Sequence, residues 1–127
     1  KRPIAVAALA LAGMLPISLF AAGIQPYTAK SFADAQASGN PVLVEIHADW
    51  CPTCRAQEPI LGKLTSQPEF SKFVRLRVDF DKQKSVVRQF KARYQSTLVV
   101  FKGKAELGRS VGDTEEDGIK ALLKKAV

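Results

Sequence analysis

Two cysteines, Cys51 and Cys54, are the residues of this chain best suited to do chemistry. They stand three positions apart in the segment Trp50-Cys51-Pro52-Thr53-Cys54, at the expected start of a helix. At this spacing both sulfurs lie on one side of the first helical turn and can close a small disulfide ring. The positive end of the helix dipole favours the thiolate, which is the nucleophilic form of cysteine. We therefore expect Cys51 to attack in thiol–disulfide exchange and Cys54, one turn further in and shielded, to resolve the product.

Two other roles for the cysteine pair stay open. One is an inert structural disulfide, although so short a loop gains little stability from chain entropy. The other is a soft metal ion held by both thiols, with His47, the only histidine of the chain, as a third ligand. A structural zinc site needs four ligands, and His47 is more typical of a rim or packing residue. We expect no metal and no cofactor.

The bulk properties favour a single globular domain of ordinary composition. The chain has 127 residues and a formal net charge of +7. Its basic residues are scattered, and the densest stretch, from Arg75 to Arg93, is interrupted by Asp79 and Asp81. No nucleic-acid recognition motif and no array of stacking aromatics accompanies them. We expect a solvated basic surface that does not bind nucleic acid.

Residues 1–22 have the layout of a secretory signal. A basic start, an apolar run and small residues follow one another: Lys1-Arg2, Ile4–Phe20 and Ala21-Ala22-Gly23. The span 4–22 is also just long enough to cross a bilayer as an uncleaved anchor, the only membrane contact that we expect. We predict a signal peptide or N-terminal membrane anchor at 1–22 and a folded domain at 23–127. That domain would be periplasmic or secreted, with or without an anchor.

Strands and helices alternate along the expected domain. Runs of β-branched and apolar residues predict strands at 42–48, 73–78, 98–101 and 105–110. Capping residues and helical spacing predict helices at 32–37 after Ser31, at 52–65, at 85–94, and after a cap at Asp113 or Thr114. A tight turn at 102–104 makes the last two strands antiparallel. The order predicts an α/β fold with a central mixed β-sheet flanked by helices.

Further segments stand at characteristic offsets from the cysteine pair: Pro59, Val78-Asp79, Thr97–Gly103 and Val111-Gly112. Together with Val42–Arg55, they make the chain from about Phe32 to Val127 resemble the thioredoxin family. The resemblance implies the thioredoxin-like fold, with Cys51 as nucleophile, Cys54 as resolving thiol and Trp50 as a wall beside them. The residues expected to contact the substrate are Trp50, Pro52, Thr53, Ser96 and Thr97.

Glu45 is an acidic residue in an otherwise apolar strand, six positions before Cys51. A buried carboxylate is costly unless it is paired, protonated or functional. The resemblance places a buried acid here, beneath the active site, so Glu45 would act as general acid and base for Cys54. Arg75 could lie near Glu45 and favour its ionised form. A solvent-facing Glu45 and a solvated Arg75 are the alternatives.

The segment Gln95-Ser96-Thr97 departs from the family pattern, in which a cis-proline precedes this threonine and guides the partner's backbone. A cis bond before a residue other than proline costs about 2.5–4 kcal/mol, so we expect the Gln95–Ser96 bond to be trans. The loss of the proline leaves thiol chemistry possible. It puts substrate docking in doubt, together with the protection of the thiols from metals.

Two functions from different classes follow. The first is a thiol–disulfide oxidoreductase outside the cytoplasm that exchanges disulfides with partner proteins through Cys51 and Cys54. The dipeptide Pro52-Thr53 helps to set the redox potential, but it does not indicate the direction of the reaction. The protein would be a reductase, an oxidant or an isomerase that acts on protein thiols and disulfides, with a membrane electron donor or acceptor as a further partner. The alternative is a thioredoxin-like binding module that holds a metal ion or a client protein without redox turnover.

Overall fold

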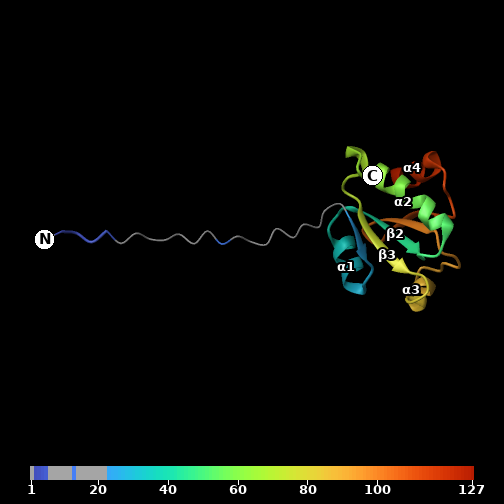
Figure 1. The fold of residues 1–127 in the computed structure, drawn as a ribbon, viewed down its shortest axis with the longest axis horizontal. Coiled ribbons are helices and arrows are strands. Elements are labelled where there is room, and N and C mark those ends of the chain that lie inside the picture. The colour runs from blue at the N-terminus through green and yellow to red at the C-terminus, as the bar shows by residue number, and fades with distance from the viewer. Residues whose placement is uncertain (1, 6–12, 14–22) are drawn as a thin grey trace.

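A five-stranded mixed sheet forms the centre of the protein. The computed structural model describes residues 2–5, 13 and 23–127 (Figure 1). The strands are β1 (Ile24–Pro26), β2 (Pro41–His47), β3 (Val74–Asp79), β4 (Thr97–Lys102) and β5 (Ala105–Val111), in the spatial order β1-β3-β2-β4-β5. β3 pairs in parallel with both β1 and β2, whereas β4 is antiparallel to β2 and β5. The predicted leader lies almost wholly outside the described residues, in which no helix is long and apolar enough to span a membrane.

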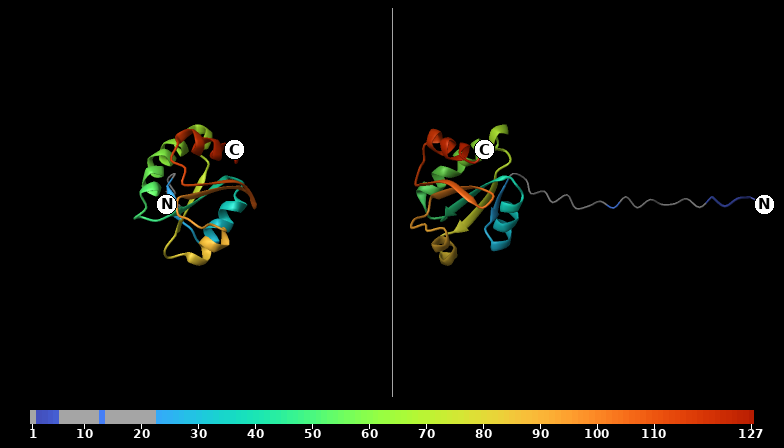
Figure 2. Two further views of the ribbon diagram at one scale, coloured as in Figure 1. Left: turned by 90° about the vertical axis from the view of Figure 1, so that its right-hand side faces the viewer. Right: turned by 180° about the vertical axis from the view of Figure 1, so that it is seen from behind.

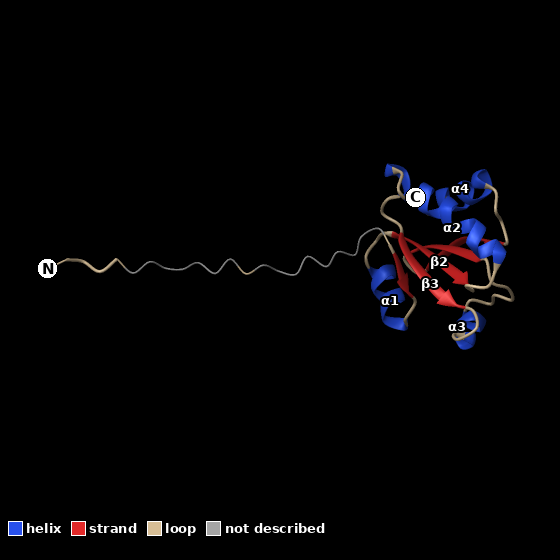
Figure 3. Cartoon of the chain, viewed as in Figure 1, coloured by secondary structure: helices blue, strands red, loops and turns tan. Residues whose placement is uncertain are grey.

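Helices cover both faces of the sheet. α1 (Ala29–Ala37) and α3 (Lys84–Gln89) lie on one face, and α2 (Pro52–Thr65) and α4 (Glu116–Lys124) lie on the other, as Figures 1 and 3 show. The views in Figure 2 show the same separation. A short 3₁₀ helix, Pro68–Phe70, links α2 to β3. The α/β fold with a mixed sheet flanked by helices is therefore confirmed.

The central strand β2 separates two apolar cores. All seven of its residues are buried, and successive side chains point to opposite faces. Val42, Val44 and Ile46 belong to the core under α1 and α3, whereas Leu43 belongs to the core under α2 and α4. The alternation places Glu45 and His47 on the α2 side, the face that carries the cysteines.

The edge strand β1 was not expected from the sequence. It has three residues, contains Pro26, and follows directly on the leader-like segment, so no strand pattern marks it. Its parallel pairing with β3 sets Ile24 opposite Arg75 and Pro26 opposite Arg77. A proline is tolerated here because an edge strand has one side without a ladder partner.

Helix α3 is shorter than predicted, ending at Gln89 instead of continuing to Tyr94. Lys91 adopts a left-handed backbone with φ of 54°. The Ala92 N–H donates to the Val87 carbonyl at 3.1 Å, and the Lys91 N–H donates to the Arg88 carbonyl at 2.9 Å. These two bonds make a Schellman motif, which usually has glycine where Lys91 stands. The absence of that glycine signal is why the sequence suggested a longer helix.

Two helix starts also differ from the prediction. α1 begins at Ala29, because Thr28 is the N-cap and forms a reciprocal capping box with Ser31. Ser31 is thus the third residue of the helix and not its cap. α4 begins at Glu116 with Glu115 as its N-cap, so neither Asp113 nor Thr114 is the cap, and Asp113 instead accepts a hydrogen bond from the Glu115 N–H at 2.8 Å.

Candidate active site

The cysteine pair sits where the loop after β2 turns into α2. Cys51 is the N-cap of α2, and Pro52 occupies its first turn, where a missing N–H costs little. The Cys51 sulfur accepts a hydrogen bond from the Cys54 N–H at 3.2 Å, so it caps the helix as a serine would. The exposed fractions are 1% for Cys51 and 2% for Cys54, so the structure shields both thiols and not the second one alone.

Ser96 is the polar group that contacts both thiols. Its hydroxyl oxygen lies 3.2 Å from the Cys51 sulfur and 3.0 Å from the Cys54 sulfur. The residue precedes β4, which is antiparallel to β2, and its N–H donates to the Ile46 carbonyl at 2.7 Å. All peptide bonds of the described residues are trans, as we expected for Gln95–Ser96. The side chain at the position of the family's proline is therefore a hydrogen-bonding partner of the thiols.

The surroundings make the two thiols unlike. Burial raises the pKa of Cys51, but hydrogen bonds with Ser96, with the thiol and N–H of Cys54, and with Gln95 outweigh burial and lower that pKa to about 7. Burial raises the pKa of Cys54 too. Hydrogen bonds with Ser96 and with the Ala48 backbone lower that pKa, but burial, the hydrogen bond with Cys51 and repulsion from the Cys51 thiolate outweigh them and keep it above the ordinary value. Near neutral pH a substantial fraction of Cys51 is therefore thiolate, whereas Cys54 remains the thiol. This asymmetry suits an attacking and a resolving cysteine.

Gln57 holds the Ser96 segment in place and was not found from the sequence. It is buried on α2, three residues after Cys54, and its amide nitrogen donates to the Ser96 carbonyl at 3.2 Å and to the Asp113 carbonyl at 2.8 Å. The N–H of Gly112 donates to the same Ser96 carbonyl at 3.0 Å. The signal that could have revealed Gln57 is its place in a run of buried helix positions with Cys54, Leu61 and Leu64.

The other predicted substrate-contacting residues fall into an exposed and a buried group. Trp50 is 56% exposed, and its indole N–H donates to Asp81 at 2.7 Å, which fixes the ring beside the cysteine loop. Pro52 is exposed and Thr53 half-buried in the first turn of α2. Thr97 is buried, and its hydroxyl donates to the Tyr94 carbonyl at 2.6 Å. The surface open to a partner is thus formed by Trp50, Pro52 and Thr53.

Glu45 forms a buried ion pair with Arg75. Both side chains are almost fully buried, and the guanidinium donates from Nε at 2.8 Å and from Nη2 at 3.0 Å to the two carboxylate oxygens. The alternatives of a solvent-facing Glu45 and a solvated Arg75 are wrong. The burial expected for Glu45 is confirmed, with Arg75 as its partner.

His47 takes part in a polar cluster with two carboxylates. Its Nε2 lies 2.9 Å from a carboxylate oxygen of Asp49 and 3.9 Å from one of Glu58. Glu58 in turn accepts a hydrogen bond from Arg77 at 2.9 Å. Within residues 2–5, 13 and 23–127, no group of three or more His, Cys, Asp and Glu side chains converges to hold a metal ion. In this part of the chain, no third side chain of these types joins the two thiols.

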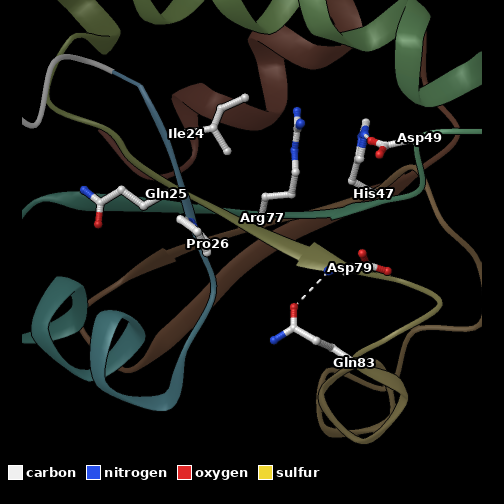
Figure 4. A pocket seen from close by; sticks show the side chains of 8 residues that line it. All are labelled: Ile24, Gln25, Pro26, His47, Asp49, Arg77, Asp79 and Gln83. Carbon is white, nitrogen blue, oxygen red and sulfur yellow. Dashed lines mark hydrogen bonds and ion pairs between the residues drawn. The ribbon is translucent and has the colours of Figure 1, made fainter.

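A pocket of about 340 Å³ lies at the carboxyl ends of the three parallel strands, beside the cysteine loop (Figure 4). Its lining residues are Ile24, Gln25, Pro26, His47, Asp49, Arg77, Asp79 and Gln83. Arg77 and His47 point from the sheet toward α2, and the Nε of Arg77 has no hydrogen-bond partner among the described residues. Neither cysteine is among the described residues that line the pocket. The thiols thus lie outside this pocket, against the Ser96 segment.

Comparison with known proteins agrees with the geometry. The thioredoxin family matches residues 23–125. A thioredoxin of Chlamydia trachomatis is 33% identical over 102 residues, which cover 80% of this chain and 97% of that protein. A mitochondrial thioredoxin of Mus musculus is 30% identical over 90 residues, covering 71% of this chain and 54% of that protein.

A solved structure is similar over the same region. The crystal structure of Trxlp from Edwardsiella tarda is 40% identical to this chain, with a TM-score of 0.76, and the similarity covers 80% of this chain and 98% of that one. The fold, the helix-capping cysteine pair and the matched residues all lead to one assignment. The chain belongs to the thioredoxin family, whose members are thiol–disulfide oxidoreductases.

Proposed function

We propose that this protein works outside the cytoplasm and exchanges disulfides with partner proteins through Cys51 as nucleophile and Cys54 as resolving thiol. The observation that carries the proposal is the pair of unlike thiols at the start of α2, one with a pKa of about 7 and the other with a raised pKa. The secretory layout of residues 1–22 supports the location.

In the reducing direction, the Cys51 thiolate attacks one sulfur of the partner's disulfide. A mixed disulfide forms, and the partner's other sulfur leaves as a thiolate that takes up a proton. Cys54 then gives up its proton and attacks the Cys51 sulfur. The Cys51–Cys54 bond forms and the partner's second sulfur leaves, so two electrons pass from this protein to its partner. The same steps in reverse oxidise a partner dithiol.

A protein partner fits the surroundings of the pair. Trp50 and Pro52 form exposed surface on either side of Cys51 in the chain, whereas Cys51 itself is only 1% exposed. A partner's sulfur therefore reaches Cys51 only when neighbouring side chains move. Binding energy from a docked protein surface can offset the cost of that movement.

Glu45 is proposed as the acid and base for Cys54. It lies on the α2 face of β2, but both its carboxylate oxygens accept hydrogen bonds from Arg75, and the side chain that contacts the Cys54 sulfur is the Ser96 hydroxyl. Proton transfer between Glu45 and Cys54 would therefore pass through a water molecule. The ion pair also gives Glu45 a structural role, and the experiment in the Discussion separates the two.

Trapping of mixed disulfides tests the exchange mechanism. In cells expressing the Cys54→Ser variant, acid quenching and alkylation should reveal covalent partner complexes on a non-reducing gel, because Cys51 still attacks but nothing resolves the product. The complexes should disappear with reductant. The Cys51→Ser variant and the double variant are matched controls and should show none. If Cys54→Ser also shows none, or if the wild-type chain is purified with a metal ion on its thiols, the binding module takes the place of the oxidoreductase.

The location has its own test. We expect the chain to be found outside the inner membrane, either released by osmotic shock after cleavage or held at the membrane and open to added protease in spheroplasts. Deleting residues 1–22 should leave it inside the cell. Protection of the full chain from protease until the cells are lysed would contradict the proposed location. Outside the cytoplasm a reductase needs an electron donor, and we propose that this donor is a membrane protein.

A further inference from the structure

We propose that the Ser96 hydroxyl sets the redox poise of the cysteine pair, stabilising the reduced state and so making the protein a stronger oxidant than it would be without this hydroxyl. The inference rests on the proposed thiol–disulfide exchange and adds a residue that tunes its redox equilibrium. Its basis is a single buried hydroxyl within hydrogen-bond distance of both sulfurs.

The hydroxyl can serve both sulfurs at once only in the reduced protein. A serine hydroxyl has one hydrogen to donate and two lone pairs to accept with. It can donate to the Cys51 thiolate and accept from the Cys54 thiol, so a chain of hydrogen bonds runs from Cys54 through Ser96 to Cys51. Hydrogen bonds to a charged partner are stronger than those between neutral groups. This arrangement stabilises the one-thiolate, one-thiol form.

Oxidation removes what this hydroxyl binds. When the Cys51–Cys54 bond forms, the thiolate charge and the thiol proton are both lost, and neutral sulfur is a weak acceptor. Ser96 is only 3% exposed, so water cannot easily take the place of the lost partners. A buried hydroxyl without a good partner is costly, and this cost falls on the oxidised state. Both effects favour the dithiol.

The backbone of Ser96 is fixed by three hydrogen bonds, which keep its side chain beside the two sulfurs. The Ser96 N–H is bound to the Ile46 carbonyl, and its own carbonyl accepts from Gly112 and Gln57. Its φ is 61°, a left-handed conformation that is uncommon for serine. Such a conformation persists only where the surroundings over-determine it, as these bonds do.

Equilibration with glutathione measures the poise directly. The reaction converts the protein dithiol and one glutathione disulfide into the protein disulfide and two glutathione thiols, so two electrons and two protons are transferred. In the full chain, we expect Ser96→Ala and Ser96→Gly to shift this equilibrium about tenfold toward the protein disulfide, the size of one hydrogen bond to a charged group. A tenfold change corresponds to a potential about 30 mV more reducing.

A second readout reports on the thiolate itself. Ser96 is one of the groups that lower the pKa of Cys51, so both variants should titrate above the wild-type value of about 7 in thiolate absorbance. Glycine relieves the left-handed backbone and alanine does not, so agreement between the two variants assigns the effect to the hydroxyl. Unchanged or more oxidising equilibria in both variants would overturn the proposal.

Thr65→Val is the matched control. Thr65 carries another buried hydroxyl on α2, which donates to the Leu61 carbonyl at 2.7 Å and is not a partner of either thiol. Its loss should leave the equilibrium with glutathione unchanged even if the protein is less stable. The equilibrium needs no partner protein. Failure to trap partner proteins would thus count against the proposed function alone. An equilibrium with glutathione that is the same in the wild-type protein and in both Ser96 variants would count against this inference alone.

Discussion

Replacing Cys51 with serine is expected to lower the rate of disulfide exchange by about a thousandfold or more, because a serine hydroxyl is not ionised near neutral pH and the attacking thiolate is lost. The measurement is the reaction of the reduced protein with an aromatic disulfide reagent whose released thiolate absorbs light. Cys54→Ser should keep the first, fast attack. If instead the Cys54→Ser variant reacts slowly and the Cys51→Ser variant reacts fast, Cys54 is the nucleophile and the assigned roles are wrong.

The same reaction has an expected pH dependence. Only the thiolate attacks, so the rate of the wild-type protein should rise with pH to a midpoint at about 7 and then level off. Below the midpoint it should fall about tenfold for each pH unit, as the thiolate fraction does. Because the pKa of Cys54 is raised, it should not contribute a second step in this range. A midpoint near the ordinary cysteine value of 9.0 would show that the site does not activate Cys51.

Replacing Arg75 with methionine is expected to lower the free energy of unfolding by about 3–5 kcal/mol, because it leaves the Glu45 carboxylate buried and unpaired. Both partners are at least nine-tenths buried, so water does not compensate for the loss. Denaturant unfolding of the reduced protein measures the effect. Lys30→Ala removes the exposed ion pair with Asp34 and should change stability far less. Equal effects of the two substitutions would contradict the buried-pair description.

Removing both charges separates the structural role of Glu45 from its proposed catalytic one. Glu45→Leu combined with Arg75→Met should regain most of the lost stability, since apolar residues of similar volume can replace a buried ion pair. If Glu45 is the acid and base for Cys54, this stable double variant should still resolve mixed disulfides slowly, with an altered pH dependence. Resolution at the wild-type rate and pH dependence would leave the ion pair with a structural role only.

The parts of the fold that were predicted correctly are those with local signals. The apolar run of β2, the helix that begins at Pro52 and the turn at Gly103 each depend on neighbouring residues, and Gly103 does adopt a positive φ of 57°. β1 was missed because it becomes a strand only by pairing with β3, some fifty residues later. The end of α3 was missed because Lys91 takes the place of the usual glycine.

In the candidate site too, the features with a local signal were predicted and those that depend on distant segments were not. The spacing of Cys51 and Cys54 is local, so their position at the helix start was predicted from the sequence. The contact of Ser96 with both sulfurs is not, because it requires the segment before β4 to meet the end of β2 and the start of α2. The bond between Glu45 and Arg75 likewise depends on the register in which Arg75 lies opposite Leu43. The sequence suggested these residues, but only their packing shows what each one contacts.

A redox titration of the full chain tests the central claim most directly, that Cys51 and Cys54 form one reversible redox pair. The metal-free protein is equilibrated with mixtures of reduced and oxidised glutathione, quenched with acid, and its free thiols are counted by alkylation and mass spectrometry. We predict a single reversible transition in which two thiols per chain are lost together, absent in both single-cysteine variants. Thiols that stay reduced across the whole range, or that only become singly modified by glutathione, would contradict the claim.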